Sequence, residues 1–267
     1  MSFVQKIISS RKEKEARFYE FIQTKKNVRK ILVLRNGLLG DIVFITPVLE
    51  RLHKTFPSSI IDVVVSEQAK ELLHHNPAIR TIRYLHSDPS LTEQTKLYST
   101  LRHEQYDIAL ILESNTHYSI MSPFIGAKYV VTFQNSWDFL ADISVAWKDG
   151  VHHVASELET VKSWTDNPSE HTLRLYVSEN EITNAKELLM REGITDVTRI
   201  FCFHPGCNEP NSVRQWIVER YAQLADSLSE LYNIQIIFTG VKRDRQEIEL
   251  IQQKMKCTSV NLAGNTS

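Results

Sequence analysis

The sequence predicts an α/β protein built from two successive halves, each with a doubly wound parallel sheet. From residue 30 onward, short apolar runs rich in β-branched residues alternate with helix-like segments. The runs are almost continuously apolar, which is typical of parallel strands buried on both faces. A second alternation of the same kind begins at residue 200, after a less regular stretch. This repetition of strand and helix favours helices packed on both sides of a sheet.

The expected elements follow from these patterns in chain order. The strands expected for the first sheet are residues 31–34, 60–65, 82–85, 107–112 and 129–133, with helices at 42–55, 67–75 and 92–103. Further helices are expected at residues 153–164 and 179–192. The second half has expected strands at 200–203, 234–239 and 259–262, with helices at 218–232 and 244–255. We therefore expect an N-terminal helix in residues 1–27, a first domain at 28–195 and a partial second domain at 196–267.

Composition excludes several classes of protein. With 267 residues, 42% hydrophobic, and 31 basic against 32 acidic side chains, the chain is neither disordered, collagenous nor a coiled coil. Cys202, Cys207 and Cys257 form no C-x-x-C pair, which predicts a reducing, cytoplasmic location without disulfides. No apolar run reaches the length of a membrane span, and residues 1–10 lack the features of a signal peptide. No basic stripe extends along the chain, so nucleic-acid binding is not expected.

The first 30 residues are the exception to this even charge balance. They hold nine Lys and Arg residues against three Glu, and their apolar residues recur at three- and four-residue steps. An amphipathic helix is therefore expected. Such a helix either packs on the body of the protein with a solvated charged face, or lies on anionic lipid.

The first candidate site is Arg35-Asn36-Gly37-Leu38-Leu39-Gly40-Asp41, between the first strand and a helix. The glycines Gly37 and Gly40 allow a tight turn and close approach of a ligand. Asp41 would lie where open α/β sheets bind ligands, at a helix N-terminus that favours the ionised carboxylate. It is a candidate general base, or a helix cap. The pattern is not G-x-G-x-x-G, so a nicotinamide site is disfavoured.

Two further turns follow strands of the second half. His204-Pro205-Gly206-Cys207-Asn208, with Arg214 and Trp216 downstream, is a candidate site for a diphosphate and a stacked base or sugar. A surface arginine with a core tryptophan is the alternative. The turn from Gly240 to Asp244 is weak by itself. Neither a D-x-D pair nor a zinc ligand set is present, so no metal site is expected.

Taken together, these residues resemble one family. The segment ILVLRNGLLGDIVFITPVLERLHKTFP is similar to the opening of glycosyltransferase family 9, the ADP-heptose:lipopolysaccharide heptosyltransferases. The positions that carry the pattern are Arg35, Gly40, Asp41, Thr46, Pro47 and Pro57. The later segments HPGCN, RQW, ERYAQLADSL, FTG and NLAGNTS follow the order and spacing of the family, so the resemblance covers Val28 to the end.

The resemblance implies a GT-B fold with two Rossmann-like domains, the first binding the acceptor and the second a nucleotide-sugar. It implies an inverting, metal-independent transferase without a cofactor, with Asp41 as the catalytic base. The enzyme would move a heptose or a related sugar from a nucleotide-sugar, and ADP-heptose is the expected donor. The acceptor would be a lipopolysaccharide core or lipid A-linked sugar, reached by peripheral contact with the cytoplasmic face of the inner membrane. The donor-binding residues would be Gly206, Cys207, Arg214, Trp216, Gly240 and Asp244. The acceptor-side loop would contain Arg35, Gly37, Gly40 and Thr46.

The sequence departs from the family pattern at several positions. Arg214 stands where lysine is usual, Ile217 where proline is common, and Ile111 where many members have an acid, although Glu113 is close by. The sequence ends at Ser267, before the family's D-T-G-x-x-H stretch. We therefore expect a C-terminally truncated member. The alternative is a non-catalytic relic that binds glycolipid or a partner.

Overall fold

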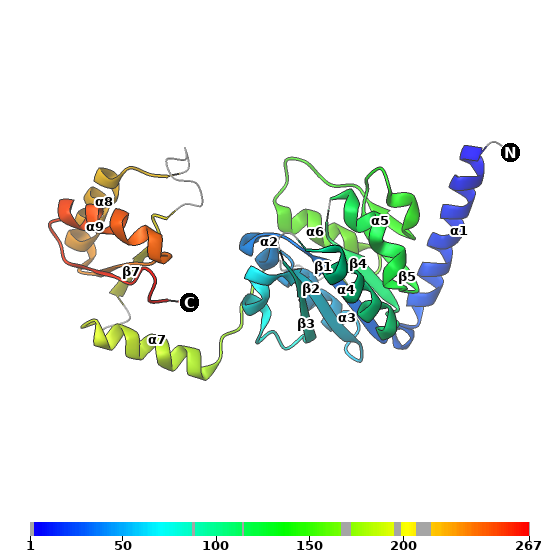
Figure 1. Cartoon of the computed structure of the whole chain (residues 1–267), viewed down its shortest axis with the longest axis horizontal. Coiled ribbons are helices and arrows are strands. Elements are labelled where there is room, and N and C mark those ends of the chain that lie inside the picture. Colours follow the sequence, from blue (N-terminus) through cyan, green and yellow to red (C-terminus); the bar gives the residue numbers. More distant parts are fainter. Residues whose placement is uncertain are drawn as a thin grey trace. The chain divides into compact units, whose positions relative to one another are not determined.

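The computed structural model describes residues 3–86, 89–113, 115–166, 172–194, 199–206 and 215–266 (Figure 1). The chain divides into two compact units, Met1–Val177 and Ser178–Ser267. Within the described ranges, no helix is both long enough and apolar enough to span a bilayer.

The first unit is built on a six-stranded sheet in which every neighbouring pair is parallel. The strands are β1 (Lys30–Arg35), β2 (Ile60–Ser66), β3 (Ile79–Leu85), β4 (Ile108–Ile111), β5 (Tyr129–Phe133) and β6 (Ile143–Val145). Their order is β3-β2-β1-β4-β5-β6. The chain reverses its direction of winding between β1 and β4, and ligands of doubly wound sheets bind outside the carboxyl ends of the strands at such a point.

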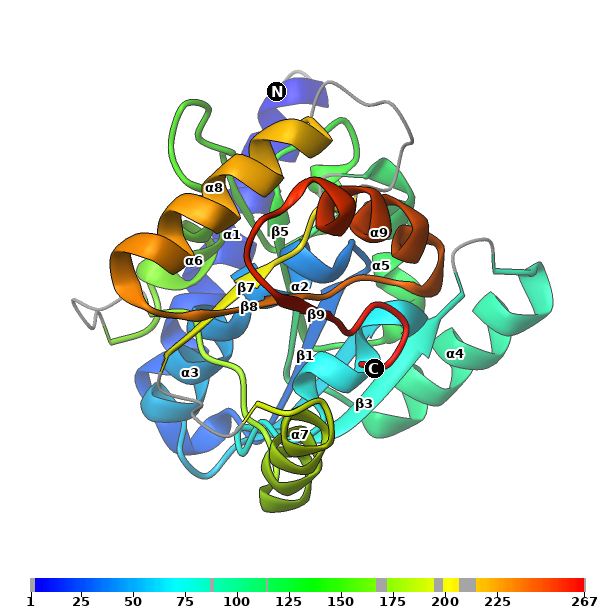
Figure 2. The ribbon, with the colours of Figure 1, turned by 90° about the vertical axis from the view of Figure 1, so that its left-hand side faces the viewer.

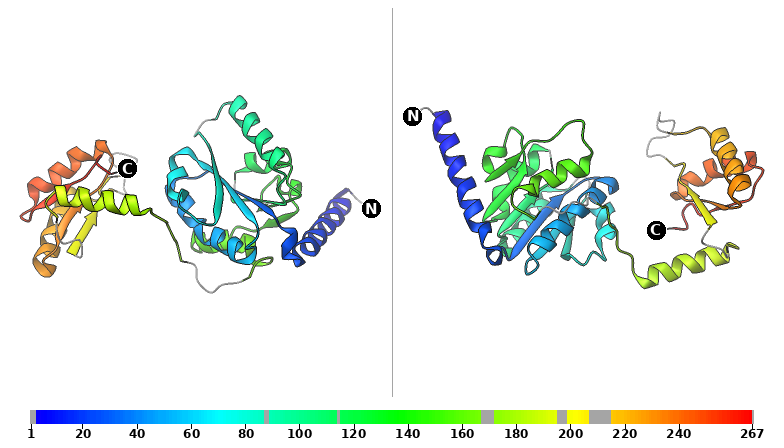
Figure 3. Two further views of the ribbon diagram at one scale, coloured as in Figure 1. Left: turned by 90° about the horizontal axis from the view of Figure 1, so that it is seen from below. Right: turned by 180° about the vertical axis from the view of Figure 1, so that it is seen from behind.

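Helices cover both faces of this sheet, as Figures 1 and 3 show. The helices of this unit are α1 (Phe3–Gln23), α2 (Leu39–Phe44), α3 (Thr46–Thr55), α4 (Leu91–Glu104), α5 (Thr116–Ile125) and α6 (His153–Lys162). One apolar core joins a face of the sheet to α1, α2, α3 and α6, and the other joins the opposite face to α4 and α5. Both layers exist because β1, β2 and β4 carry apolar side chains on both faces.

The predicted strands of the first half are confirmed, and four features of its helices and strands were missed or wrong. The single helix expected at 42–55 is two helices, and the first begins earlier, at Leu39. Residues Glu67–Leu73 form a 3₁₀ helix, η2. The helix α5 and the three-residue strand β6 were not expected. Pro123 lies inside α5, and β6 is too short to produce a readable periodicity.

The N-terminal helix α1 is anchored by its last turns. Phe18 and Ile22 are buried in the core that also contains α3 and α6, and the Phe18 ring meets the Trp164 ring edge-on at 5.6 Å. The Tyr19 hydroxyl donates to Ser163 Oγ at 2.8 Å. Figure 3 shows the beginning of the helix standing out from the rest of the unit. The packed alternative therefore holds for the C-terminal half of this helix.

The second unit has a three-stranded parallel sheet in the order β7-β8-β9. Its elements are α7 (Glu179–Arg191), β7 (Ile200–Phe203), α8 (Val218–Tyr232), β8 (Gln235–Phe238), the 3₁₀ helix η5 (Lys242–Asp244), α9 (Arg245–Lys254) and β9 (Ser259–Asn261). Figure 2 shows α8 and α9 on one side of these strands and α7 on the other. The central strand β8 is the buried one, whereas Phe201 on β7 is 43% exposed.

The helix α7 belongs to the second unit, so the division falls ahead of it and not after residue 195. Leu188 and Leu189 pack against Ile237 and Leu262 of the second core. The sequence did not indicate this, because an amphipathic helix between two sheets can pack its apolar face on either one.

A buried aspartate interrupts the apolar run of β2. Asp62 is fully buried, and its Oδ2 accepts a hydrogen bond from the Tyr106 hydroxyl at 2.7 Å. Arg80 Nε donates to Oδ1 at 2.9 Å, and Arg83 Nη1 donates to Oδ2 at 3.3 Å. Burial by itself would raise the pKa of Asp62, but the hydrogen bonds from Arg80 and Tyr106 outweigh it and hold the pKa below its usual value.

We predict that Asp62→Asn lowers the free energy of unfolding by about 3 kcal/mol at neutral pH, because it removes one partner of a buried ion pair. Urea unfolding measures this loss. Asp166→Asn is the matched control, since Asp166 pairs with Lys25 at 2.7 Å on the surface and is worth at most about 1 kcal/mol. Equal losses in the two variants would contradict a buried role for Asp62.

Candidate functional site at the carboxyl end of the first sheet

Asp41 lies in the first turn of α2, just beyond the carboxyl end of β1 (Figure 1). Its Oδ2 accepts the backbone N–H of Leu38 at 2.8 Å, and its Oδ1 accepts from Arg35 Nη2 at 3.1 Å. The side chain nevertheless remains 29% exposed. The two sequence interpretations are therefore not exclusive. Asp41 caps the helix, and its carboxylate is still open to solvent at the edge where doubly wound sheets bind ligands.

The two glycines of this segment have different roles. A Cβ added at Gly37 would lie 2.5 Å from Asp41 Cβ and 2.6 Å from Asp41 Oδ2, so only glycine lets the aspartate fold back on this turn. Gly40 lies inside α2, and an added Cβ there would meet nothing within 4 Å. Of the two, Gly37 is the glycine that the position of Asp41 requires.

Arg35 fixes Asp41 from the buried side. Its guanidinium is almost enclosed, and Nη1 donates to the backbone carbonyl of Leu112. Besides donating to Asp41, Nη2 lies 3.4 Å from Oε1 of Glu157, a fully buried residue of α6. Burial, only partly opposed by Arg35, raises the pKa of Glu157 to about 8. Arg35 therefore lies between one partly exposed and one buried carboxyl group.

A third carboxyl group completes the cluster. Glu113, just after β4, accepts the backbone N–H of Asn36 at 2.5 Å, and Asn36 Nδ2 donates to the Tyr118 hydroxyl at 2.6 Å. Burial raises the pKa of Glu113, and the charge of Arg35 partly opposes this. Sequence reasoning noted Glu113 only as a neighbour of Ile111 and missed Glu157. The signal for Glu157 was weak, because an acid in an amphipathic helix is usually solvated.

Thr46, expected on the acceptor side, is fully buried. Its hydroxyl donates to the Val43 carbonyl at 2.8 Å and accepts the backbone N–H of Arg174 at 3.2 Å. It thus joins the start of α3 to the segment that leaves the first unit. The structure places Thr46 in the interior and does not bring it to the surface with Asp41.

In the second unit, three of the expected donor residues come together. Asp244 Oδ2 accepts the Val241 N–H at 2.8 Å, and the side chain is only 8% exposed. A Cβ on Gly206 or Gly240 would lie 2.3 Å or 2.8 Å from this same oxygen. The turns after β7 and β8 therefore both close over the Asp244 carboxylate. Both glycines lie at the carboxyl edge of the second sheet.

The remaining donor candidates are placed only in part. Trp216 is 44% exposed, and its ring meets the Tyr221 ring edge-on at 5.1 Å. Tyr221 in turn contacts the ring of Phe203, the last residue of β7. Trp216 is therefore a surface residue and not a core one. Cys207 and Arg214 lie outside the described residues. In the part of the chain that is described, no three His, Cys, Asp or Glu side chains group as metal ligands.

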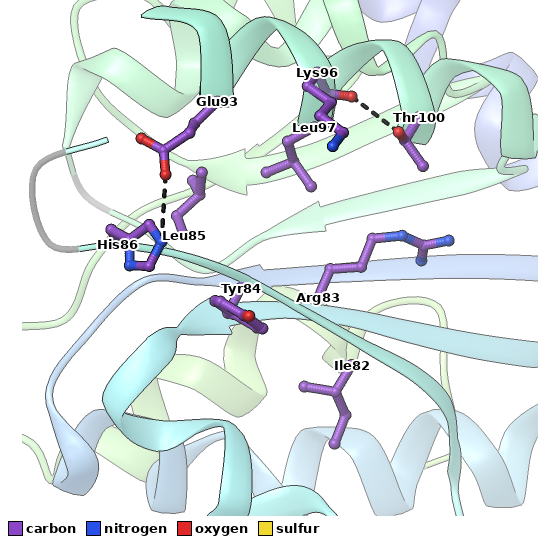
Figure 4. Close-up of a pocket in the computed structure, with 9 residues that line it drawn as sticks. All are labelled: Ile82, Arg83, Tyr84, Leu85, His86, Glu93, Lys96, Leu97 and Thr100. Carbon is purple, nitrogen blue, oxygen red and sulfur yellow. Dashed lines mark hydrogen bonds and ion pairs between the residues drawn. The ribbon is translucent and has the colours of Figure 1, made fainter. Parts of the chain in front are cut away.

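A cavity of about 360 Å³ lies beside β3 and α4, at the outer edge of the first sheet (Figure 4). Figure 4 shows His86 and Glu93 pointing toward one another, with His86 Nε2 3.3 Å from Glu93 Oε1. His86 Nδ1 also lies 2.6 Å from Glu67 Oε2 of η2. The cavity contains none of the residues predicted for the site. Sequence reasoning missed it because its lining comes from an edge strand and the following helix without a motif.

Two successive α/β units, each built on a parallel sheet, are what a GT-B fold requires. The sequence pattern of Glycosyltransferase family 9 (heptosyltransferase) matches residues 94–267. This is more than half of the chain, and the chain therefore belongs to that family. The matched range begins after Asp41, so the first motif lies outside it.

Individual relatives agree with this assignment. The lipopolysaccharide core heptosyltransferase OpsX of Haemophilus influenzae is 22% identical over 249 residues, which cover 90% of this chain and 68% of the relative. A crystal structure of a family 9 glycosyl transferase from Veillonella parvula covers 89% of this chain and 70% of that one, with a TM-score of 0.80 and 22% identity. ADP-heptose LPS heptosyltransferase II of Escherichia coli covers 89% and 73%, with a TM-score of 0.68 and 23% identity. At these identities the solved structures establish the fold.

We predict that Gly37→Ala lowers the free energy of unfolding by about 2 kcal/mol, because the new methyl group overlaps the Asp41 side chain and forces the turn to shift. Gly40→Ala is the matched control. It places the same methyl group three residues later in open space within a helix, where alanine stabilises by up to about 1 kcal/mol. Urea unfolding of both variants tests this. An equal change in the free energy of unfolding would mean that the position of Asp41 does not depend on Gly37.

Glu157 makes the stability of the first unit depend on pH. In the folded chain its pKa is about 8, well above the value of about 4.3 expected when unfolded, so the folded state binds this proton more tightly. The stabilisation from this proton is complete below about pH 4 and is lost as the pH rises to about 8. Relative to Glu157→Gln, the free energy of unfolding of the unmodified chain should fall by on the order of 4 kcal/mol across this window.

Urea unfolding of the two proteins over this range of pH measures the difference. Glu159→Gln is the control on the same helix, because hydrogen bonds from Lys148 and Lys162 lower the pKa of Glu159. The difference in free energy of unfolding between the unmodified chain and Glu159→Gln should not fall with rising pH. A constant difference for Glu157→Gln as well would show that folding does not raise the pKa of Glu157.

Proposed function

We propose that this chain is an inverting, metal-independent glycosyltransferase that moves a heptose from ADP-heptose to a sugar of the lipopolysaccharide core, with Asp41 as the general base. The single observation that carries the assignment of Asp41 is its geometry. Arg35 and the Leu38 N–H hold its carboxylate at the carboxyl end of a central strand, yet 29% of the side chain is exposed. Family membership and the names of the relatives supply the reaction class and the substrates.

The transfer reaction requires a correctly positioned base more than a strong one. An acceptor hydroxyl forms its new C–O bond at the anomeric carbon while the bond from that carbon to the diphosphate oxygen breaks. The hydroxyl proton passes to an Asp41 oxygen during attack, because a carboxylate is too weak a base to remove it beforehand. Both Asp41 oxygens already accept one hydrogen bond each, and each retains a further lone pair for the acceptor.

On the donor side, the proposal assigns the nucleotide-sugar to the second unit. Its support is the pair of glycines Gly206 and Gly240, which follow β7 and β8 at the carboxyl edge of the second sheet and both pack on Asp244. Backbone N–H groups in glycine turns suit a diphosphate. Trp216 offers an exposed aromatic face to a base or sugar. Cys207 and Arg214 keep their proposed roles in donor binding from the sequence alone.

The proposed acceptor also implies where the protein works. A lipopolysaccharide core sugar is attached to lipid, so transfer takes place at a membrane surface. We propose peripheral contact with the cytoplasmic face of the inner membrane. The basic N-terminal helix supports this, since Figure 3 shows its beginning standing out from the first unit.

The proposal predicts that Asp41→Asn reduces the rate of transfer at least about 100-fold, because the amide cannot take the acceptor proton. Release of ADP from ADP-heptose in the presence of core acceptor measures the rate. Binding of ADP-heptose should change little, since Asp41 belongs to the first unit and the donor site is assigned to the second.

Asp166→Asn is the control for this experiment, because Asp166 pairs with Lys25 before β1 at the opposite end of that strand. It should retain full transfer. Equal rates for Asp41→Asn and the unmodified chain would reject Asp41 as the base. Absence of transfer in the unmodified chain, with ADP-heptose and acceptor both bound, would favour the non-catalytic alternative.

A further inference from the structure

The proposed base has a buried neighbour that the transfer chemistry above does not use. Glu157 is fully buried on α6, and within the described chain neither of its carboxyl oxygens has a hydrogen-bond partner. Its Oε1 lies 3.4 Å from Arg35 Nη2, and this same nitrogen donates to Asp41 Oδ1 at 3.1 Å. The two carboxyl groups therefore share a single nitrogen of one guanidinium.

The charged groups around Glu157 come from three elements. They are Arg35 from β1, Asp41 from α2 and Glu113 after β4. On α3, which also packs against α6, the charge of Arg51 acts on Glu159. Of the described cations, only Arg35 acts on the charge of Glu157, and Arg35 also pairs with Asp41 and acts on the charge of Glu113. A buried guanidinium cannot fully neutralise three carboxylates, so they compete for it.

We propose that Glu157 is a positioning residue of the transfer reaction, which sets through the shared Arg35 guanidinium how tightly the proposed base Asp41 is held and how readily it accepts a proton. This inference rests on the proposed function of Asp41. It adds a second carboxyl group, on a different element, that acts on the base without touching a substrate.

Two states follow from the shared nitrogen. When Glu157 carries a proton, it is a weak competitor, and the charge of Arg35 is directed at Asp41 and weakens it as a base. When Glu157 loses its proton, Arg35 is divided between two anions, and the added negative charge strengthens the attraction of Asp41 for a proton. The second state favours removal of the acceptor proton.

The kinetic test compares the unmodified chain with Glu157→Gln, which keeps the size of the side chain and fixes it in the neutral form. At about pH 6 the two should have kcat values within about twofold of each other, whereas at about pH 9 the variant should be slower by about tenfold. KM for ADP-heptose should be the same in both. A loss of kcat that is equal at all pH values would indicate a purely structural role and overturn the proposal.

Glu159→Gln is the matched control, because Glu159 is on the same helix and its carboxylate pairs with Lys148 and Lys162 at 2.9 Å. Its pH profile should follow that of the unmodified chain. If Glu159→Gln showed the same loss of kcat at about pH 9, the effect would belong to the helix and not to Glu157.

A measurement without substrate separates this inference from the proposed function. In NMR spectra of protein with ¹⁵N-labelled arginine, the Arg35 guanidinium signals are identified as those that disappear in Arg35→Lys. In the unmodified chain they should shift with a midpoint near the pKa of Glu157, about 8, and in Glu157→Gln this shift should disappear. Signals that do not titrate overturn the coupling whatever the enzyme does. Signals that titrate in a chain without transfer activity support the coupling and reject the proposed function.

Discussion

The carboxyl end of the first sheet is organised by one buried guanidinium. Arg35 is the last residue of the apolar strand β1, so its charge lies in a region from which water is largely excluded. Such a charge is stable only when it is paired, and Arg35 is surrounded by Asp41, Glu113 and Glu157. The geometry of the site follows from this constraint. Asp41 is held from within by the guanidinium, and its other oxygen is held by the main chain of its own turn.

The same local structure, an aspartate bonded to the main chain of its own turn, occurs in both units with different exposure. In each, an aspartate in the turn that follows a strand accepts the backbone N–H three residues before it at 2.8 Å, with a glycine immediately before that N–H. The difference is exposure, since Asp41 is 29% exposed whereas Asp244 is 8% exposed beneath two glycine turns. A partly exposed carboxylate can meet a hydroxyl. A covered one instead shapes the main chain above it.

Glu157 shows that a residue under a strong structural constraint can leave only a weak signal in the sequence. Glu157 has the sequence environment of an ordinary acid on an amphipathic helix, two positions before Glu159, which does pair with surface lysines. Because successive helical residues point in different directions, one of these acids meets solvent and the other meets Arg35. Nothing in the spacing of the two distinguishes them. The burial of Glu157 is decided by where α6 packs on α2 and α3, which involves residues more than 100 positions apart.

The sequence by itself determined the alternation of strands and helices, the parallel sheets and the turn that carries Asp41. These are local properties, because apolar periodicity and glycine positions act over a few residues. The tertiary structure alone decided that α7 joins the second unit, that Thr46 is interior and that Gly37 is the glycine on which Asp41 depends. It also brought three acids to one arginine from separate elements. Those outcomes depend on which faces meet across long sequence separations, and the free energy of a shared, desolvated charge exists only once they have met.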